Sequence, residues 1–168
     1  GPAVRQAIQA GYIICTQKAS PNTASTPATS ATYMLRWDEG GEYAKTPNAF
    51  RGIFVGEGHR TSIPNAFFDR VLLQEPLAVT KVVATVLRHT VGYQNQFGGR
   101  REHAALSYSY IQKHAQLGGR ANLSNAIQKA LECNYIRRVE QGTVAAKSSD
   151  RRPAQYAVKW LPQAGSNL

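Results

Sequence analysis

Cysteine is scarce in this chain, and long apolar runs are absent from it. Only Cys15 and Cys133 occur among the 168 residues, and neither has the C-x-x-C or Cys/His spacing of a zinc site. The longest apolar stretch, 77–87, is interrupted by polar side chains and falls far short of the ~20 residues of a membrane span. We therefore expect a reduced, metal-free and cofactor-free chain without a membrane-spanning segment.

The sequence also lacks the signatures of common enzyme classes. It contains no G-x-x-x-x-G-K-[ST] loop, no H-E-x-x-H and no G-x-S-x-G, and its 10 carboxylates form no cluster suited to two-metal catalysis. We expect a protein that is not an enzyme. The four histidines show no metal-ligand spacing, and we assign no chemistry to His59, His89, His103 and His114.

Positive charge is what the sequence has in excess. Lys and Arg number 20 against 10 Asp and Glu, which gives a formal net charge of +10. Residues 1–99 carry +3 of this charge and residues 100–168 carry +7. Concentrated positive charge favours a polyanionic partner, because Lys and Arg at phosphates release condensed counterions. A basic, solvated surface is the alternative.

Hydrophobic residues make up 42% of the chain, enough for a core, and their spacing predicts four helices between residues 66 and 133. The first two are a short helix over 66–73 and a broad-faced core helix over 76–90, with Pro76 at its first helical position.

A helix-turn-helix is predicted next. Ser107 is a good N-cap for a helix over 108–115, and the turn 116–119 leads into a helix over 120–133. This last helix has one apolar stripe, and its other faces are polar and basic.

Two segments of alternating polarity, 135–139 and 155–160, predict the strands of a hairpin. The loop between them is basic. Three helices followed by a hairpin with a basic tip is the order of a winged helix, whose helix-turn-helix places its second helix in the major groove of DNA.

The chain contains an internal repeat with an offset of 123 positions. Segment 7–13 aligns with 130–136, and without a gap segment 33–37 falls on 156–160. An alanine, two tyrosines and a tryptophan are identical at fixed spacing, and the conservative pairs are Ile8 with Leu131, Leu35 with Val158 and Arg36 with Lys159. We infer an α+β fold of tandem winged-helix units, the first of them incomplete.

The first unit starts in its middle in this alignment. Segment 4–10 matches the end of the recognition helix and 12–37 matches the hairpin, while the earlier helices are missing. Gly1-Pro2 looks like the scar that a protease leaves on a recombinant protein, so we expect a truncated unit that packs on the second unit or on a partner chain. The predicted organisation is a partial winged-helix unit over 1–37, a linker over 38–62 with a short strand at 53–55, a complete winged-helix domain over 63–162 and a tail over 163–168.

Particular residues between 63 and 136 resemble a known group of domains. They are the opening Ile63-Pro64-Asn65, the helix end Leu87-Arg88-His89-Thr90-Val91-Gly92-Tyr93, the start Leu106-Ser107-Tyr108-Ser109 and the closing Leu131-x-x-Asn134-Tyr135-Ile136. This pattern resembles the winged-helix N-terminal domain of lambdoid phage O-type replication proteins and related plasmid and mobile-element initiators. The resemblance covers 74 of the 168 residues and implies DNA binding in replication initiation. Related domains also occur in transcription regulators and primosome proteins.

The polar side of the helix over 120–133 would meet base edges in a DNA groove. Arginine suits guanine and asparagine suits adenine through paired hydrogen bonds, and a solvated helix face is the alternative. The candidates on this helix are Arg120, Asn122, Ser124, Asn125, Gln128 and Lys129.

Further candidates would hold phosphate. Those at the hairpin tip would bind phosphate or reach into a minor groove, against the alternative of an ordinary charged tip. Arg100 and Arg101, ahead of the helix-turn-helix, would clamp the DNA backbone, and a salt bridge to Glu102 is the alternative. For Tyr108 the alternative is packing in the core. The set comprises Lys147, Arg151 and Arg152 at the tip, Arg100 and Arg101, and the weaker Lys113, Tyr108 and Lys18.

Aromatic residues recur at matching positions of the repeat. We expect them in hairpin cores rather than as a platform for stacked bases. They are Tyr12, Tyr33 and Trp37 in the first copy and Tyr135, Tyr156 and Trp160 in the second.

Two functions fit the sequence. The first is a sequence-specific binder of double-stranded DNA that acts in replication initiation of a phage, plasmid or other mobile element, with a transcription regulator of the same fold as an alternative. It would work on the nucleoid, in the cytoplasm of a bacterial or phage-infected cell. The second is a protein-interaction adaptor. We expect the first, because helix polarity, hairpin charge and net charge agree, with a homodimer or a replication or transcription protein left open as a further partner.

Overall fold

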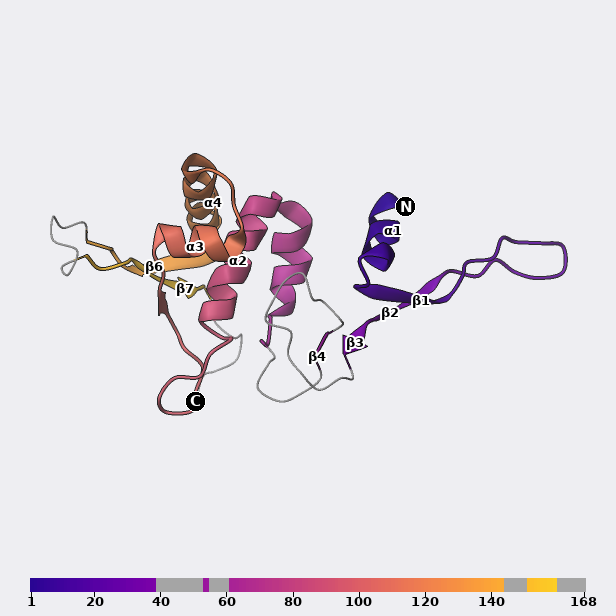
Figure 1. Cartoon of the computed structure of the whole chain (residues 1–168), viewed down its shortest axis with the longest axis horizontal. Coiled ribbons are helices and arrows are strands. Elements are labelled where there is room, and N and C mark those ends of the chain that lie inside the picture. The colour runs from indigo at the N-terminus through magenta and orange to yellow at the C-terminus, as the bar shows by residue number, and fades with distance from the viewer. Residues whose placement is uncertain (39–52, 55–60, 144–150, 160–168) are drawn as a thin grey trace, which may run out of the picture. The chain divides into compact units, whose positions relative to one another are not determined.

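The computed structural model describes residues 1–38, 53–54, 61–143 and 151–159 (Figure 1). The chain divides into two compact units, Gly1–Arg60 and Thr61–Leu168, called unit 1 and unit 2 below. The boundary between them falls inside the segment 38–62 that the sequence predicts as a linker. Both units combine helices with small sheets, so the fold class is α+β.

Unit 2 combines helices with a three-stranded antiparallel sheet in the order β5-β7-β6. Ile136 of β6 lies opposite Val158 of β7, and Ala104 of β5 lies opposite Tyr156 on the other side of β7. The predicted helices and hairpin strands are present, whereas β5 was not predicted. In chain order the elements are η2 (Phe67–Leu72), α2 (Leu77–His89), β5 (Ala104–Ala105), α3 (Tyr108–Ala115), α4 (Arg120–Glu132), β6 (Ile136–Glu140) and β7 (Gln155–Val158).

Two local details differ from the sequence prediction. The first helix is wound as a π-helix, a wider form that places Phe67 and Val71 in the core. Pro76 is the N-cap of α2 rather than its first helical residue, and its backbone is extended there, with ψ at 149°. Its carbonyl still accepts the first hydrogen bond of the helix, from the Thr80 amide at 3.1 Å, so Pro76 begins α2 from outside.

The core of unit 2 lies where α2 packs against α3, α4 and the sheet. Val82 and Val86 of α2, Ile111 of α3, Leu123 of α4 and Tyr156 of β7 all have no exposed surface. Full burial of one such aliphatic side chain contributes roughly 1.5–3 kcal/mol. This cluster fixes the inner stripe of α4, and therefore also fixes which face of α4 points outward.

The connection between α3 and α4 is a tight turn. Ser107 caps α3 as predicted, because its Oγ accepts a hydrogen bond from the Tyr110 amide at 3.1 Å. The helix ends at Gln116 in the left-handed conformation, and Gly119, with φ at 75°, precedes α4. Glycine adopts such a positive φ without the strain that a side chain brings.

The described residues of unit 1 form a helix, a hairpin and two very short strands. The hairpin strands are antiparallel, whereas the short strands are parallel and place Trp37 opposite Ile53. The strand at Ile53–Phe54 lies within the predicted segment 53–55. The elements are α1 (Pro2–Gln9), β1 (Ile13–Gln17), β2 (Thr32–Leu35), β3 (Trp37–Asp38) and β4 (Ile53–Phe54).

The internal repeat is present in the backbone as well as in the sequence. An offset of 123 positions carries the bounds of β1 and β2 onto those of β6 and β7, and the end of α1 onto the end of α4. Ile13 faces Leu35 as Ile136 faces Val158, and the register shift in the middle of the first strand recurs at the equivalent place.

The repeat extends beyond the regular elements. The residue that follows the helix is left-handed in both copies, with φ at 74° for Gly11 and 57° for Asn134. Farther along the hairpin, an isolated bridge joins Ser20 to Thr29 and its counterpart joins Thr143 to Arg152. The two copies therefore share one backbone design of helix, tight turn and long hairpin.

Equivalent positions of the repeat differ in burial. Tyr156 has no exposed surface, whereas its counterpart Tyr33 is 44% exposed. Tyr12 is 53% exposed, whereas its counterpart Tyr135 is half-buried against the core. The prediction of a hairpin core is confirmed for Tyr156 and wrong for Tyr12 and Tyr33. The reason is that α2 and α3 cover this face in unit 2, and the described part of unit 1 has no such helices.

Candidate nucleic-acid interface

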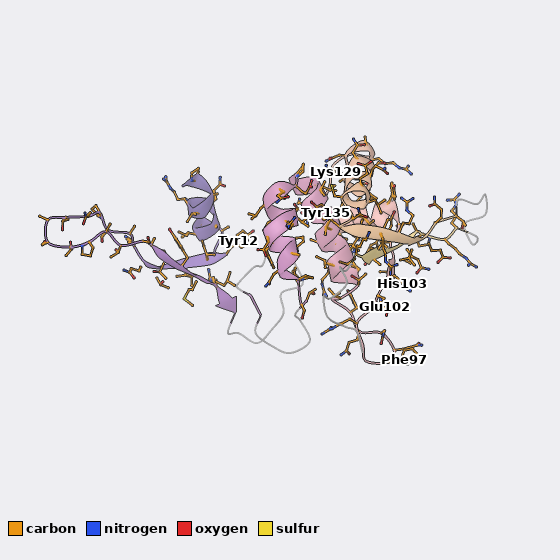
Figure 2. The ribbon with its side chains drawn as sticks, turned by 180° about the vertical axis from the view of Figure 1, so that it is seen from behind. Tyr12, Phe97, Glu102, His103, Lys129 and Tyr135 are labelled. Carbon is orange, nitrogen blue, oxygen red and sulfur yellow. The ribbon has the colours of Figure 1, made fainter. Side chains whose placement is uncertain are left out.

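The outer side of α4 carries amide and basic side chains. Because Leu123 and Ile127 turn into the core, the residues at 122, 125 and 129 share the opposite face. Figure 2 marks Lys129 on this helix. The exposed candidates on α4 are Arg120, Asn122, Asn125, Gln128 and Lys129.

Two members of the predicted α4 set are partly engaged elsewhere. Ser124 is half-buried and so lies at the margin of the exposed face rather than on it. Gln128 donates a hydrogen bond from Nε2 to Oε1 of Glu132 at 2.9 Å. Glu132 is the one acidic residue of α4 and is its last residue, far from Arg120 at the start of the helix, and this bond orients its carboxylate.

The hairpin contributes a second group of basic side chains. Arg151 and Arg152 are exposed, and Lys147 lies outside the described residues. The Thr143 amide donates to the Arg152 carbonyl at 2.8 Å, and the Arg152 amide donates to Oγ1 of Thr143 at 3.1 Å. These bonds continue the hairpin past β6 and β7, and Figure 1 shows it extending beyond the helices of unit 2.

Sequence reasoning missed two arginines in β6. Arg137 and Arg138 are exposed, near the start of β6, the strand that follows α4. The Arg138 guanidinium lies 5.7 Å from the centre of the Tyr156 ring and donates to Oε1 of Gln141 at 3.1 Å. The signal was available, because the predicted strand 135–139 contains two adjacent arginines, and a strand points one of any two adjacent side chains away from its buried face.

Arg100 and Arg101 are both exposed in the loop between α2 and β5, and Arg101 is held by a neighbouring ring. The guanidinium of Arg101 lies 5.1 Å from the ring centre of Tyr93, and that of Arg88 lies 5.0 Å from it. Such cation–π contacts hold a guanidinium in place without neutralising it. The alternative to a role in DNA binding, an ion pair with Glu102, stays a prediction.

Asn95 shapes the same loop. Its Oδ1 accepts hydrogen bonds from the amides of Phe97 at 2.9 Å and Gly99 at 3.0 Å. This closed turn presents Phe97, which is 85% exposed, at the outer end of the loop (Figure 2). An aromatic side chain next to basic residues is compatible with contact to a base or sugar.

The remaining candidates are dispersed. Lys113 is exposed on α3. Tyr108 is half-buried and packs against the core, which is the alternative to phosphate binding that the sequence offered for it. Lys18 is exposed in unit 1. The structure thus places the α4, hairpin and α3 candidates in one unit and Lys18 in the other.

A buried histidine joins α2 to α3. His89 stacks on Tyr93 with 5.6 Å between ring centres and meets His114 of α3 edge-on at 4.9 Å. Burial lowers the pKa of His89 from its ordinary value of 6.5, and the nearby His114, Arg88 and Arg101 lower it further. His89 is therefore neutral at neutral pH and serves the packing of the two helices.

A carboxylate fixes the exit of α4. Tyr135 Oη donates to Oε1 of Glu75 at 2.8 Å, and the Sγ of Cys133 donates to the same oxygen at 3.7 Å. The hydrogen bond to Glu75 raises the pKa of Tyr135 to about 12. Because Glu75 lies between η2 and α2, this contact ties the start of unit 2 to the turn between α4 and the hairpin.

Other site types are not indicated in the part of the chain that the structure describes. Its His, Cys, Asp and Glu residues form no group of three that could hold a metal ion, and none of its helices is long and apolar enough to cross a membrane. Comparisons with family models, curated protein sequences and solved structures find no match to this chain.

Proposed function

We propose that unit 2 is a winged helix that binds double-stranded DNA, with α4 as the recognition helix and the β6–β7 hairpin as the wing. An α-helix is about 10–12 Å across, and the major groove of B-DNA is about 12 Å wide, so a helix with one polar outer face fits it. The hairpin would then lie along the backbone or in the adjacent minor groove.

The observation that carries this proposal is the division of α4 into two faces. The residues of its inner stripe are at most 3% exposed, which fixes the orientation of the helix. Its outer face presents amide and basic side chains, with a single acidic residue at the last turn. Asparagine pairs bidentately with adenine and arginine with guanine. Asn122, Asn125 and Arg120 would therefore read bases.

The charge of unit 2 supports the same function. Thr61–Leu168 holds 14 Lys and Arg against 6 Asp and Glu, a formal net charge of +8. The exposed Arg137, Arg138, Arg151 and Arg152 would supply phosphate contacts. Such contacts give affinity for any duplex and make it depend steeply on salt.

Unit 1 would be a second, partial winged helix. Its hairpin register and its helix end repeat those of unit 2, and α1 carries Arg5 exposed and no acidic residue. Two tandem units would read adjacent segments of one site. The resemblance around Ile63-Pro64-Asn65 and Leu131-x-x-Asn134-Tyr135-Ile136 supports a role in replication initiation at the origin of a phage, plasmid or mobile element. An operator-binding regulator would use the same surface.

A protein-interaction adaptor is the second candidate, favoured by exposed leucines. Leu73 and Leu77 are 77% and 67% exposed, and Phe68 and Leu72 lie beside them in η2 at 46% and 49%. Apolar residues gathered in this way often mark a protein contact. The adaptor predicts weak, sequence-independent DNA binding.

Selection from random duplex DNA tests the proposal. The chain is used to enrich duplexes at two salt concentrations, and fluorescence anisotropy then compares the enriched duplex with its scrambled version. We expect an enriched motif bound at least about 1,000-fold more tightly than the scramble, with affinity falling steeply in salt. Absence of enrichment, with feeble binding to both duplexes, would favour the adaptor.

A further inference from the structure

An apolar face of unit 1 is exposed although its counterpart in unit 2 forms the core. α1 has no buried residue, and Val4 and Ile8 are 36% and 38% exposed. On the hairpin, Tyr33 and Leu35 are 44% and 47% exposed. These four side chains define the half-core face of unit 1.

The repeat identifies what covers the equivalent face in unit 2. Ile127, the counterpart of Val4, is 1% exposed, and Tyr156, the counterpart of Tyr33, has no exposed surface. Both belong to the cluster in which α2 and α3 lie over α4 and the sheet. The covering helices contribute mainly Val82, Val86 and Ile111.

We propose that the half-core face of unit 1 is a docking surface for a pair of helices with the apolar pattern of α2 and α3, attached ahead of α1 as α2 and α3 are attached ahead of α4. The proposal does not depend on DNA binding. It assigns to α1 the role that residues 125–132 have in α4.

Chemical identity at the covered positions supports this occupant over an unrelated partner. Ala7 matches Ala130, and Ile13 matches Ile136. In unit 2 both counterparts are buried, at 0% and 2% exposed. A face that keeps alanine and isoleucine where the folded copy buries them is shaped for the same kind of helix.

Backbone geometry supports attachment ahead of α1. The register of β1 with β2 and the left-handed residue after the helix match unit 2, so α1 leaves the hairpin along the same path as α4. Helices attached ahead of α1 through a turn like 116–119 would reach the half-core face in the way α3 reaches α4. A short connection also lowers the entropy cost of closing the core.

The test supplies the proposed cover from the chain itself. Residues 61–125 are joined directly to Ala3 of the full chain, which keeps the repeat in register. Gly1 and Pro2 are omitted, because a proline inside the extended helix would break it. The control fusion carries Val82→Asp and Val86→Asp in the added segment only. Hydrogen exchange then measures protection of the amides in α1, β1 and β2 in the fusion, the control and the original chain.

We expect these amides to exchange about 100-fold or more slowly in the fusion than in either other protein, because opening would now require unfolding of a complete core. Equal exchange in the fusion and its control would overturn the proposal. Two other results would overturn it by naming a different occupant. Protection in the original chain that grows with protein concentration, together with dimers in sedimentation, would assign the face to a second copy. Protection in the original chain at every concentration would assign it to a contact within this chain.

Discussion

If unit 2 binds DNA as proposed, removal of positive charge from the hairpin should weaken that binding and reduce its dependence on salt concentration. The perturbation is the double variant Arg151→Ala/Arg152→Ala, whose two side chains are exposed beyond β7. Each phosphate contact adds about 0.9 to the slope of log affinity against log salt, so losing two contacts lowers the slope by about 1.8. Between about 50 and 200 mM salt, the gap between wild type and variant should therefore close by about 12-fold.

The loss should be the same for every duplex, because phosphate contacts carry no sequence information. Asn125→Ala provides the contrast, since loss of a paired hydrogen bond to a base should cost about 1–3 kcal/mol on the enriched duplex only and leave the salt slope unchanged. Arg70→Ala/Lys81→Ala is the charge-matched control, because these residues lie on η2 and α2.

Fluorescence anisotropy at three salt concentrations, on enriched and scrambled duplexes, measures all four proteins. An unchanged slope for Arg151→Ala/Arg152→Ala would refute the phosphate contacts. A loss confined to the enriched duplex would refute them as well and would indicate minor-groove reading instead. Equal affinities for wild type, Asn125→Ala and the hairpin variant would refute the whole interface.

Three further predictions concern stability. The pKa of Tyr135 is about 12 in the folded chain against an ordinary 10.0, so the free energy of unfolding should fall as the pH rises from 10.0 to about 12. Glu75→Gln should reduce that fall, and urea unfolding across this pH range measures it. The pKa of His89 is below its ordinary 6.5 in the folded chain, so the unfolded chain binds this proton first as the pH falls. The free energy of unfolding should therefore fall as the pH drops below 6.5. A thermal melting midpoint that does not change with pH there, or whose pH dependence is the same in His89→Gln, would contradict this. Ser107→Ala should cost about 1 kcal/mol in urea unfolding through loss of the α3 cap.

Much of the backbone of unit 2 follows from local signals. Ser107 caps α3 because a serine ahead of a helical apolar pattern satisfies a free amide, and Leu123 with Ile127 defines the inner stripe of α4. β5 has no such signal. Ala104 and Ala105 form a strand only because β7 offers an unpaired edge to them, a tertiary effect that no local pattern encodes.

The candidate interface was predictable to a similar extent. The spacing of Asn122, Asn125 and Lys129 places them on one helix face, and the structure exposes all three. The position of Arg101 over Tyr93 was not predictable, because it depends on the turn that Asn95 builds from its own side chain. Side chains in loops are placed by such particular contacts rather than by periodicity.

The two copies of the hairpin separate what local sequence determines from what packing determines. Their register agrees, including the shift that follows Cys15 and Arg138, although one copy is covered by helices and the other is exposed. Register is therefore specified within helix, turn and strands, whereas burial of Tyr33 or Tyr156 depends on the helices in front of them. The proposed interface on α4 would need both the hairpin register and the packed core. The hairpin alone can carry arginines, but only the buried stripe that includes Leu123 would hold the outer face of α4 at a fixed angle.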